Sequence, residues 1–224
     1  MYSNLVNFFD RWGPVIFKAT GETLQMVLIT ITISLIIGLP LGVLLILTRP
    51  GKQYENKFVY LTLNSIINMI RSVPFIILLF FLLPFTKFLV GTSIGVKGVL
   101  VPLVIYTSPY VARLMENALL EVDSGVIEAY TSMGISPKDI IWHVLIREAR
   151  PSIVLGMTIA IIGLIGATAM AGLVGAGGLG DLAYRYGHLR YQTSVMRSTV
   201  LILILLVQSI QTFGNRLSAK LKKD

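Results

Sequence analysis

The sequence predicts an all-α integral membrane protein with five membrane-spanning helices. Its 224 residues are 54% hydrophobic and only 13% charged, and their mean hydropathy is +0.78. Soluble domains carry about a quarter charged residues. Several apolar runs reach about twenty residues, the length with which a helix rising about 1.5 Å per residue crosses about 30 Å of hydrocarbon. These observations exclude a soluble domain.

The five spans follow from the hydropathy in chain order. They are expected at about residues 23–47, 58–83, 99–120, 151–174 and 198–213. Gly38, Pro40 and Gly42 lie inside the first span and are expected to kink it. The residues before this span lack the basic start, short apolar run and cleavage site of a signal peptide, so we expect the span to be retained.

Basic residues outside the spans predict the orientation. An odd number of spans puts the two ends of the chain on opposite sides of the membrane. The side with the loop between the third and fourth spans carries more Lys and Arg, so the positive-inside rule places it in the cytoplasm. Residues 1–19 are then an extracytoplasmic segment, and residues 212–224 are a basic cytoplasmic tail.

Residue composition argues against several other classes of protein. The net charge is +8, but no basic stripe with stacking aromatic residues occurs, so nucleic acid is not an expected partner. Cysteine is absent, and His143 and His188 form no ligand-spaced pair, so no metal site is expected. The spans hold no paired carboxylates or Ser/His/Asp arrangement, and no catalytic residue is assigned.

A polar segment, IEAYTSMGISPKDIIWHVL, interrupts the apolar chain after the third span. Gly134 suits the positive-φ position that ends a helix. Ser136 is expected to N-cap a second helix with Pro137 at its first position, and Ile140, Ile141, Val144 and Leu145 form its apolar stripe. Two interpretations stay open from the pattern alone. The segment is either an amphipathic loop resting on lipid headgroups or a knob that fits a partner's groove.

The longer stretch EAYTSMGISPKDIIWHVLIREARPSIVLG resembles the EAA loop of binding-protein-dependent ABC importer permeases. Glu128, Ala129 and Gly134 stand at the spacing of that motif, whereas Tyr130 replaces its second alanine and Arg147 its proline. In that family the loop is a coupling helix seated in a cleft of a separate ATPase. The resemblance assigns this coupling role to Glu128, Ala129, Gly134, Ile135 and Ser136.

The likeness extends over about residues 20–211. The stretches GETLQMV, GLPLGVLLILTRPG, VARLMENALLEV and VGAGGLGDLAYRYG are similar to the permeases of methionine-uptake ABC transporters. The resemblance implies the type I ABC importer permease fold, with residues 20–211 as the permease domain and the coupling loop at about residues 121–150.

The same resemblance implies a multi-pass protein of the bacterial inner membrane that imports L- and D-methionine and is not itself an enzyme. The implied partners are a second copy of the chain, two ATPase subunits, an extracytoplasmic methionine-binding lipoprotein and the lipid bilayer. This chain would bind no cofactor, because ATP and Mg²⁺ would be used by the ATPase. The nearest string to a P-loop, GTSIGVKG, has the wrong spacing to cradle phosphates.

Polar residues in the second and third spans have two interpretations. Asn64, Asn68 and Arg71 share one helical face, which either bonds a neighbouring helix or lines the translocation path with Arg71 near the substrate carboxylate. Arg113 and Glu116 in the third span are three residues apart, and a salt bridge is expected between them.

The fourth span carries a face of small residues, which allows helices to approach closely. Its members are Gly156, Ala160, Gly163, Ala167 and Ala171. Packing within one subunit and a dimer seam both remain open. Met170 beside this face is a gate candidate, because its thioether side chain is adaptable. The next segment is an expected hinge or external loop, with glycines at Gly172, Gly175, Gly177, Gly178 and Gly180.

Two other functions are compatible with the sequence. One is a channel or secondary transporter whose polar segment rests on the bilayer, although the inverted repeats of many secondary transporters are not seen. The other is an ABC importer of another polar amino acid.

Overall fold

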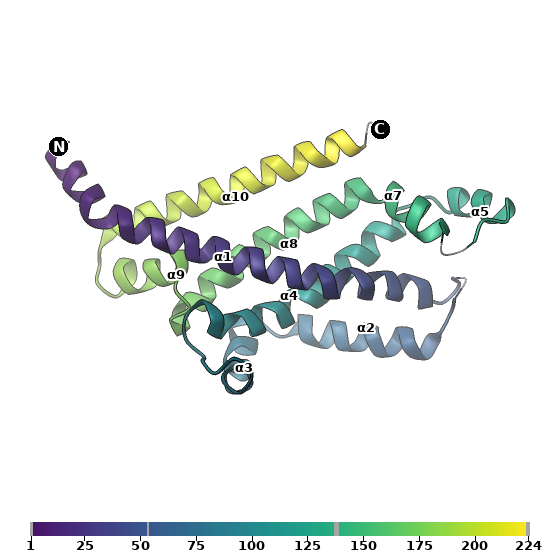
Figure 1. The fold of residues 1–224 in the computed structure, drawn as a ribbon, viewed down its shortest axis with the longest axis horizontal. Coiled ribbons are helices and arrows are strands. Elements are labelled where there is room, and N and C mark those ends of the chain that lie inside the picture. The colour runs from purple at the N-terminus through teal and green to yellow at the C-terminus, as the bar shows by residue number, and fades with distance from the viewer. Residues whose placement is uncertain (1, 53, 137–138, 223–224) are drawn as a thin grey trace. The chain divides into compact units, whose positions relative to one another are not determined.

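The computed structural model describes residues 2–52, 54–136 and 139–222, and every regular element in these ranges is a helix (Figure 1). The long helices are α1 (Tyr2–Thr48), α2 (Lys57–Ser72), α3 (Phe75–Val90), α4 (Gly95–Leu120), α8 (Arg150–Ala171) and α10 (Thr193–Leu221). The short ones are α5 (Ser124–Ser132), the π-helical turn η1 (Ile140–Leu145), α7 (Ile146–Glu148), the 3₁₀ turn η2 (Gly172–Val174), α9 (Gly178–Leu182) and the π-helical turn η3 (Ala183–His188). The predicted all-α class is confirmed for these residues.

The number of spans depends on how α2 and α3 are counted. Among the described residues, four helical stretches are long and apolar enough to cross a membrane, and α2 with α3 adds a fifth if the bent pair is one span. The sequence predicted one span at about residues 58–83, and the structure shows that this region is bent by 104° between α2 and α3. Helix α2 ends at Ser72, and α3 begins after Pro74. A proline disfavours helical geometry in the preceding residue, here Val73, so the break is local in origin.

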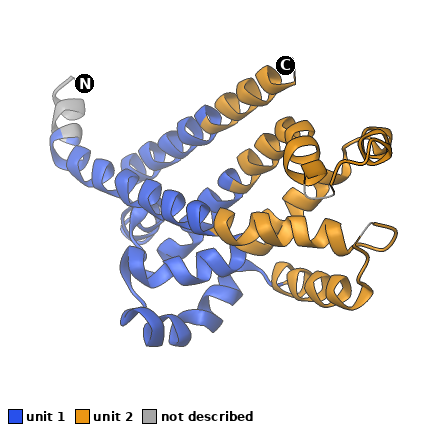
Figure 2. Ribbon diagram, turned by 45° about the vertical axis from the view of Figure 1, so that its right-hand side comes forward, with its two compact units in different colours: residues 1–33, 73–107, 161–209 blue, residues 34–72, 108–160, 210–224 orange. Residues whose placement is uncertain are grey.

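The chain divides into two compact units (Figure 2). Unit 1 comprises residues 1–33, 73–107 and 161–209, and unit 2 comprises residues 34–72, 108–160 and 210–224. Helices α1, α4, α8 and α10 each contribute a segment to both units. The predicted coupling loop, residues 121–150, therefore belongs to unit 2, and the glycine-rich segment after α8, residues 172–180, belongs to unit 1.

Close contact between α1 and α4 organises unit 2. Helix α1 continues through Pro40 without a break. A Cβ added at Gly38 would lie 2.7 Å from Val111 Cγ1, and one at Gly42 would lie 2.6 Å from Met115 Cβ. The two glycines thus serve as a contact surface that lets α1 and α4 approach closely. The sequence suggested only a kink at these positions.

The core of unit 1 joins the start of α1 to the chain that follows α8. Ala19, Leu179, Leu182 and Val195 are buried together, and half-buried aromatic residues pack around them. The rings of Trp12 and Tyr186 meet edge to face in this layer, with their centroids 5.1 Å apart. Residues from the two ends of the sequence therefore share one hydrophobic cluster.

Candidate functional site

Helix α5 ends in a reversal of the chain at residues 130–136, here called the coupling turn, which two main-chain hydrogen bonds close. Gly134 has a φ of +76°, as the sequence predicted. Its N–H donates to the carbonyl of Thr131 at 3.0 Å, and the N–H of Ile135 donates to the carbonyl of Tyr130 at 3.3 Å. This pair of bonds is the Schellman motif, which satisfies the last carbonyls of a helix. The shape of the turn is therefore set by main-chain atoms and one glycine.

The second half of the coupling segment starts from Ser136. Its Oγ accepts the N–H of Asp139 at 3.3 Å and donates to Asp139 Oδ2 at 2.6 Å. The first of these is the hydrogen bond expected of the predicted N-cap residue. Pro137, predicted at the first helical position, lies outside the described residues. The next regular element, η1, buries the predicted apolar stripe of Ile140, Ile141, Val144 and Leu145.

Helix α5 and the coupling turn leave a broad surface uncovered. No described side chain of α5 is buried, and Glu128, Ala129, Gly134 and Ser136 are all exposed. The apolar side chain of Met133 at the turn is 64% exposed. Of the five residues assigned to coupling, only Ile135 is half-buried. The segment exposes both charged and apolar groups, and its contact with a partner stays a prediction.

A hydrophobic cluster below the turn ties this segment to the long helices of unit 2. Leu145 and Ala149 pack with Ile46 of α1 and with Met115 and Leu119 of α4, and all five are buried. Protein interiors are close-packed and transmit displacement rather than absorb it. Ile127 of α5 also packs against this cluster, so α5 and η1 are both in contact with the residues that join α1 and α4.

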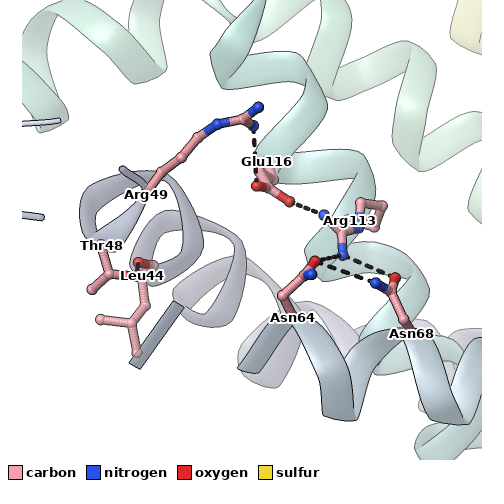
Figure 3. Close-up of polar contacts among 7 residues, drawn as sticks. All are labelled: Leu44, Thr48, Arg49, Asn64, Asn68, Arg113 and Glu116. Atoms are coloured by element: carbon pink, nitrogen blue, oxygen red, sulfur yellow. Dashed lines mark hydrogen bonds and ion pairs between the residues drawn. The ribbon is translucent and has the colours of Figure 1, made fainter. Parts of the chain in front are cut away.

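Unit 2 also contains a cluster of charged and amide side chains around the buried Glu116 (Figure 3). The Glu116 side chain is 0% exposed and accepts Arg113 Nη1 at 2.5 Å, which confirms the predicted salt bridge. Arg49, at the end of α1, reaches the other carboxylate oxygen at 3.5 Å. Arg113 Nη2 donates to Asn64 Oδ1 at 2.6 Å and to Asn68 Oδ1 at 3.0 Å. The carboxylate of Glu116 thus contacts Arg113 of α4 and Arg49, the residue after α1, and Arg113 links this pair to α2.

These contacts bear on the polar face of α2. Asn64 and Asn68 bond a neighbouring helix, as the structural interpretation predicted. Arg71 lies over the ring of Tyr110, 5.8 Å from its centroid, and is exposed. Sequence reasoning missed Arg49 and Tyr110, because no local pattern pairs either of them with α2 or with Glu116. Lining of the translocation path by Asn68 and Arg71 stays a prediction.

The small-residue face of α8 is covered only in part. Ala160, Ala167 and Ala171 are buried within the chain, and Leu114 lies 3.4 Å from a Cβ added at Gly156. A Cβ added at Gly163, in contrast, would meet nothing within 4 Å. Packing within one subunit therefore accounts for most of this face, and a dimer seam at the exposed Gly163 stays a prediction.

The gate and hinge candidates lie in unit 1. The side chain of Met170 is 49% exposed at the end of α8. Gly175, Gly177 and Gly178 have φ values of +75°, +81° and +77°. Gly172 and Gly180 instead pack directly on main-chain atoms of Asp181 and Ala169, where no Cβ fits. A positive φ or a close main-chain contact thus accounts for glycine at each of the five positions, and the role of this segment as a hinge stays a prediction.

Comparison with known proteins places this geometry in a family. Residues 34–223 match the sequence profile described as "Binding-protein-dependent transport system inner membrane component". The "Probable D-methionine transport system permease protein MetI" of Vibrio cholerae is 44% identical over 216 residues, covering 96% of each chain. The "D-methionine transport system permease protein MetI" of Escherichia coli is 46% identical over 158 residues, which are 70% of this chain and 73% of that protein.

Solved structures agree with the sequence comparison. A chain of the MetNI methionine ABC transporter in an inward-facing conformation superimposes with a TM-score of 0.90 at 44% identity, covering 92% of this chain and 96% of that chain. An amino acid ABC transporter crystallised with histidines has a TM-score of 0.79 at 20% identity and covers 95% and 96%, a likeness that shows the fold alone. The predicted type I importer fold is confirmed, and the chain belongs to the family of binding-protein-dependent transport system inner membrane components.

Proposed function

We propose that this chain is the permease subunit of an ATP-driven importer of methionine. The observation that carries the proposal is the coupling turn, an exposed and hydrogen-bonded reversal between α5 and η1, whose residues Ile127 and Leu145 pack with α1 and α4. Relatives named as D-methionine permeases and the likeness to a methionine ABC transporter support the substrate. L-methionine and D-methionine are both proposed substrates.

The proposed assembly contains two copies of this chain, two ATPase subunits and an extracytoplasmic methionine-binding protein. ATP and Mg²⁺ are used by the ATPase and not by this chain. Binding and hydrolysis of ATP displace the coupling turn, and the cluster around Leu145 passes the displacement to α1 and α4. The chain then alternates between inward-facing and outward-facing states in the bacterial inner membrane.

The orientation of the chain follows from its proposed partners. The coupling turn must reach an ATPase in the cytoplasm, so residues 212–224 form a cytoplasmic tail and residues 1–19 lie outside. The excess of Lys and Arg on the coupling side supports this orientation. Residues 20–211 form the permease domain, close to the range of the family match at residues 34–223.

Exposed polar groups on α2 support a translocation path beside this helix. Ser65, Asn68 and Ser72 share one face of α2, and all three are exposed. Asn68 accepts a hydrogen bond from Arg113 and Ser72 donates to the carbonyl of Asn68, so part of this polar face is satisfied within the chain. Hydrocarbon disfavours the groups that remain exposed. Arg71 is also exposed, and a guanidinium binds a carboxylate group well. These features support a wet path in which Arg71 attracts the substrate carboxylate.

Reconstitution tests the proposed function. The chain, its ATPase and its binding protein are placed in vesicles, and uptake of labelled methionine is measured with and without ATP. We expect uptake only with ATP and all partners, and competition by unlabelled methionine but not by other amino acids. Accumulation by the chain alone would contradict the proposal and indicate a channel or secondary transporter. Competition by another amino acid would identify a different substrate.

The coupling surface has its own test. Charge reversal of Glu128 to Lys is expected to release the ATPase during co-purification, because the side chain is exposed on α5. Asp10→Lys is the matched control, since it reverses an exposed carboxylate far from α5 in the sequence. Retention of the ATPase by the Glu128 variant, or its loss in the control, would contradict the assignment.

A further inference from the structure

The segment after α8 in unit 1 enters α9 through two glycines in left-handed geometry. Gly177 has φ +81° and ψ −165°, and Gly178 has a φ of +77°. The first of these combinations is accessible in practice only to glycine. As the N-cap residue of α9, Gly177 has no side chain to accept the free N–H groups of the first turn. These N–H groups therefore need acceptors from elsewhere in the chain.

Two adjacent residues of α1, Glu22 and Thr23, supply the acceptors. The N–H of Gly178 donates to Glu22 Oε2 at 2.7 Å, and the N–H of Leu179 donates to Thr23 Oγ1 at 2.8 Å. Thr23 is 2% exposed and Leu179 is 0% exposed, so water does not compete for the second bond. The bond to Glu22 is charge-assisted, which makes it stronger than a bond between neutral groups.

The glycines and their acceptors fit each other closely. A Cβ added at Gly177 would lie 2.5 Å from Glu22 Oε2, and a Cβ at Gly178 would lie 2.7 Å from Thr23 Oγ1. Any larger residue at either position would push the acceptor away. The stretches GETL and GAGGLG, which are 156 residues apart at their bonded positions, therefore form one device, here called the α1 latch.

The latch reaches the gate candidate through α9. Gly180, two residues beyond the latched amide of Gly178, packs directly on the main chain of Ala169. Ala169 precedes Met170, whose side chain is half exposed. Since close-packed main chains have little freedom to slide, the end of α8 is held in place by the latch. The ion pair between Lys18 and Glu22 is long, at 3.9 Å, and Lys18 is 79% exposed, so it adds little.

We propose that Glu22 and Thr23 are positioning residues for transport, which hold the start of α9 and the end of α8 to α1 through the transport cycle. Neither residue contacts the substrate in this role. The inference rests on the proposed function only where uptake is the readout. The α1 latch consists of hydrogen bonds from two main-chain amides, and the exchange rates of these amides are measured independently of uptake.

Hydrogen exchange and uptake together test the latch in the reconstituted complex. Thr23→Val removes the hydroxyl at nearly constant volume, and Glu22→Ala removes the carboxylate. We expect amide exchange in the segment 177–182 to accelerate about tenfold or more in each, because a buried N–H is left without an acceptor. Methionine imported per ATP hydrolysed is expected to fall at least severalfold, with the ATPase still bound.

Conservative variants keep the proposal falsifiable if the larger changes disturb folding. Thr23→Ser and Glu22→Gln retain an acceptor and are expected to restore slow exchange and most of the uptake. Lys18→Ala is the matched control and is expected to change neither. Unchanged exchange in Thr23→Val and Glu22→Ala would overturn the latch. Faster exchange with unchanged uptake would overturn its role in transport, and absence of uptake by the unaltered complex would instead overturn the proposed function.

Discussion

Replacement of Glu116 by alanine tests the energetics of the buried cluster in unit 2. Glu116 accepts hydrogen bonds from two guanidinium groups, and its side chain is fully buried. Removing it leaves Arg113, which is 17% exposed, facing only the two amide oxygens of Asn64 and Asn68. A guanidinium in this position has lost its counter-ion but has not gained access to water.

The expected size of the effect follows from the burial. Removal of one partner of a buried ion pair costs about 3–5 kcal/mol of folding free energy. One kcal/mol shifts the melting temperature by about 2–4 °C in a chain of this size, so Glu116→Ala is expected to lower Tm by about 6–20 °C. Arg49 is 39% exposed and 3.5 Å from the carboxylate. Arg49→Ala is therefore expected to cost at most about 1 kcal/mol, or about 4 °C.

Melting of the purified chain in detergent, followed by tryptophan fluorescence, measures both variants under one condition. Glu116→Gln is the second control, because it keeps the volume and one acceptor while removing the charge, and it is expected to fall between the other two. A Glu116→Ala protein that melts within about 2 °C of the unaltered chain would refute the reasoning. An equal decrease in Tm in Arg49→Ala would show that burial of the side chain does not determine its contribution to folding free energy.

Three further outcomes are expected. Gly42→Ala places a methyl group 2.6 Å from Met115 Cβ and should destabilise the chain by about 1–3 kcal/mol, whereas Gly166→Ala, with nothing within 4 Å, should leave Tm unchanged. Gly134→Ala meets no neighbour, so its cost of about 1–2 kcal/mol arises from the positive φ alone, and co-purification should show weaker ATPase retention by an intact dimer. Arg71→Ala should reduce methionine uptake without loss of assembly, and normal uptake would exclude this residue from the path.

Local sequence patterns predicted local structure well. The positive φ of Gly134, the burial of the apolar stripe in η1 and the pairing of Arg113 with Glu116 all depend on residues within a few positions of each other. Hydropathy located the spans because a helix that crosses the hydrocarbon core needs about twenty consecutive apolar residues. The missed break before α3 was also local, and Pro74 was visible as its signal.

Contacts between distant segments were beyond reach of such patterns. Asn64 and Asn68 were read correctly as a polar face, but their partner Arg113 follows only from the packing of α2 on α4. Gly42 lies near Pro40 in the sequence and therefore suggested a kink. Its actual role, close contact with α4, follows only from the position of Met115. The acceptors of Gly178 and Leu179 lie at the other end of the chain.

The main-chain bonds at Gly134 separate the shape of the coupling turn from the chemistry of its surface. The bend is specified by amide and carbonyl groups that every residue carries, so the surrounding side chains are not needed to build it. Under the proposed coupling role, substitution of the exposed side chains would change the surface offered to the ATPase and would leave the main-chain shape of the turn in place.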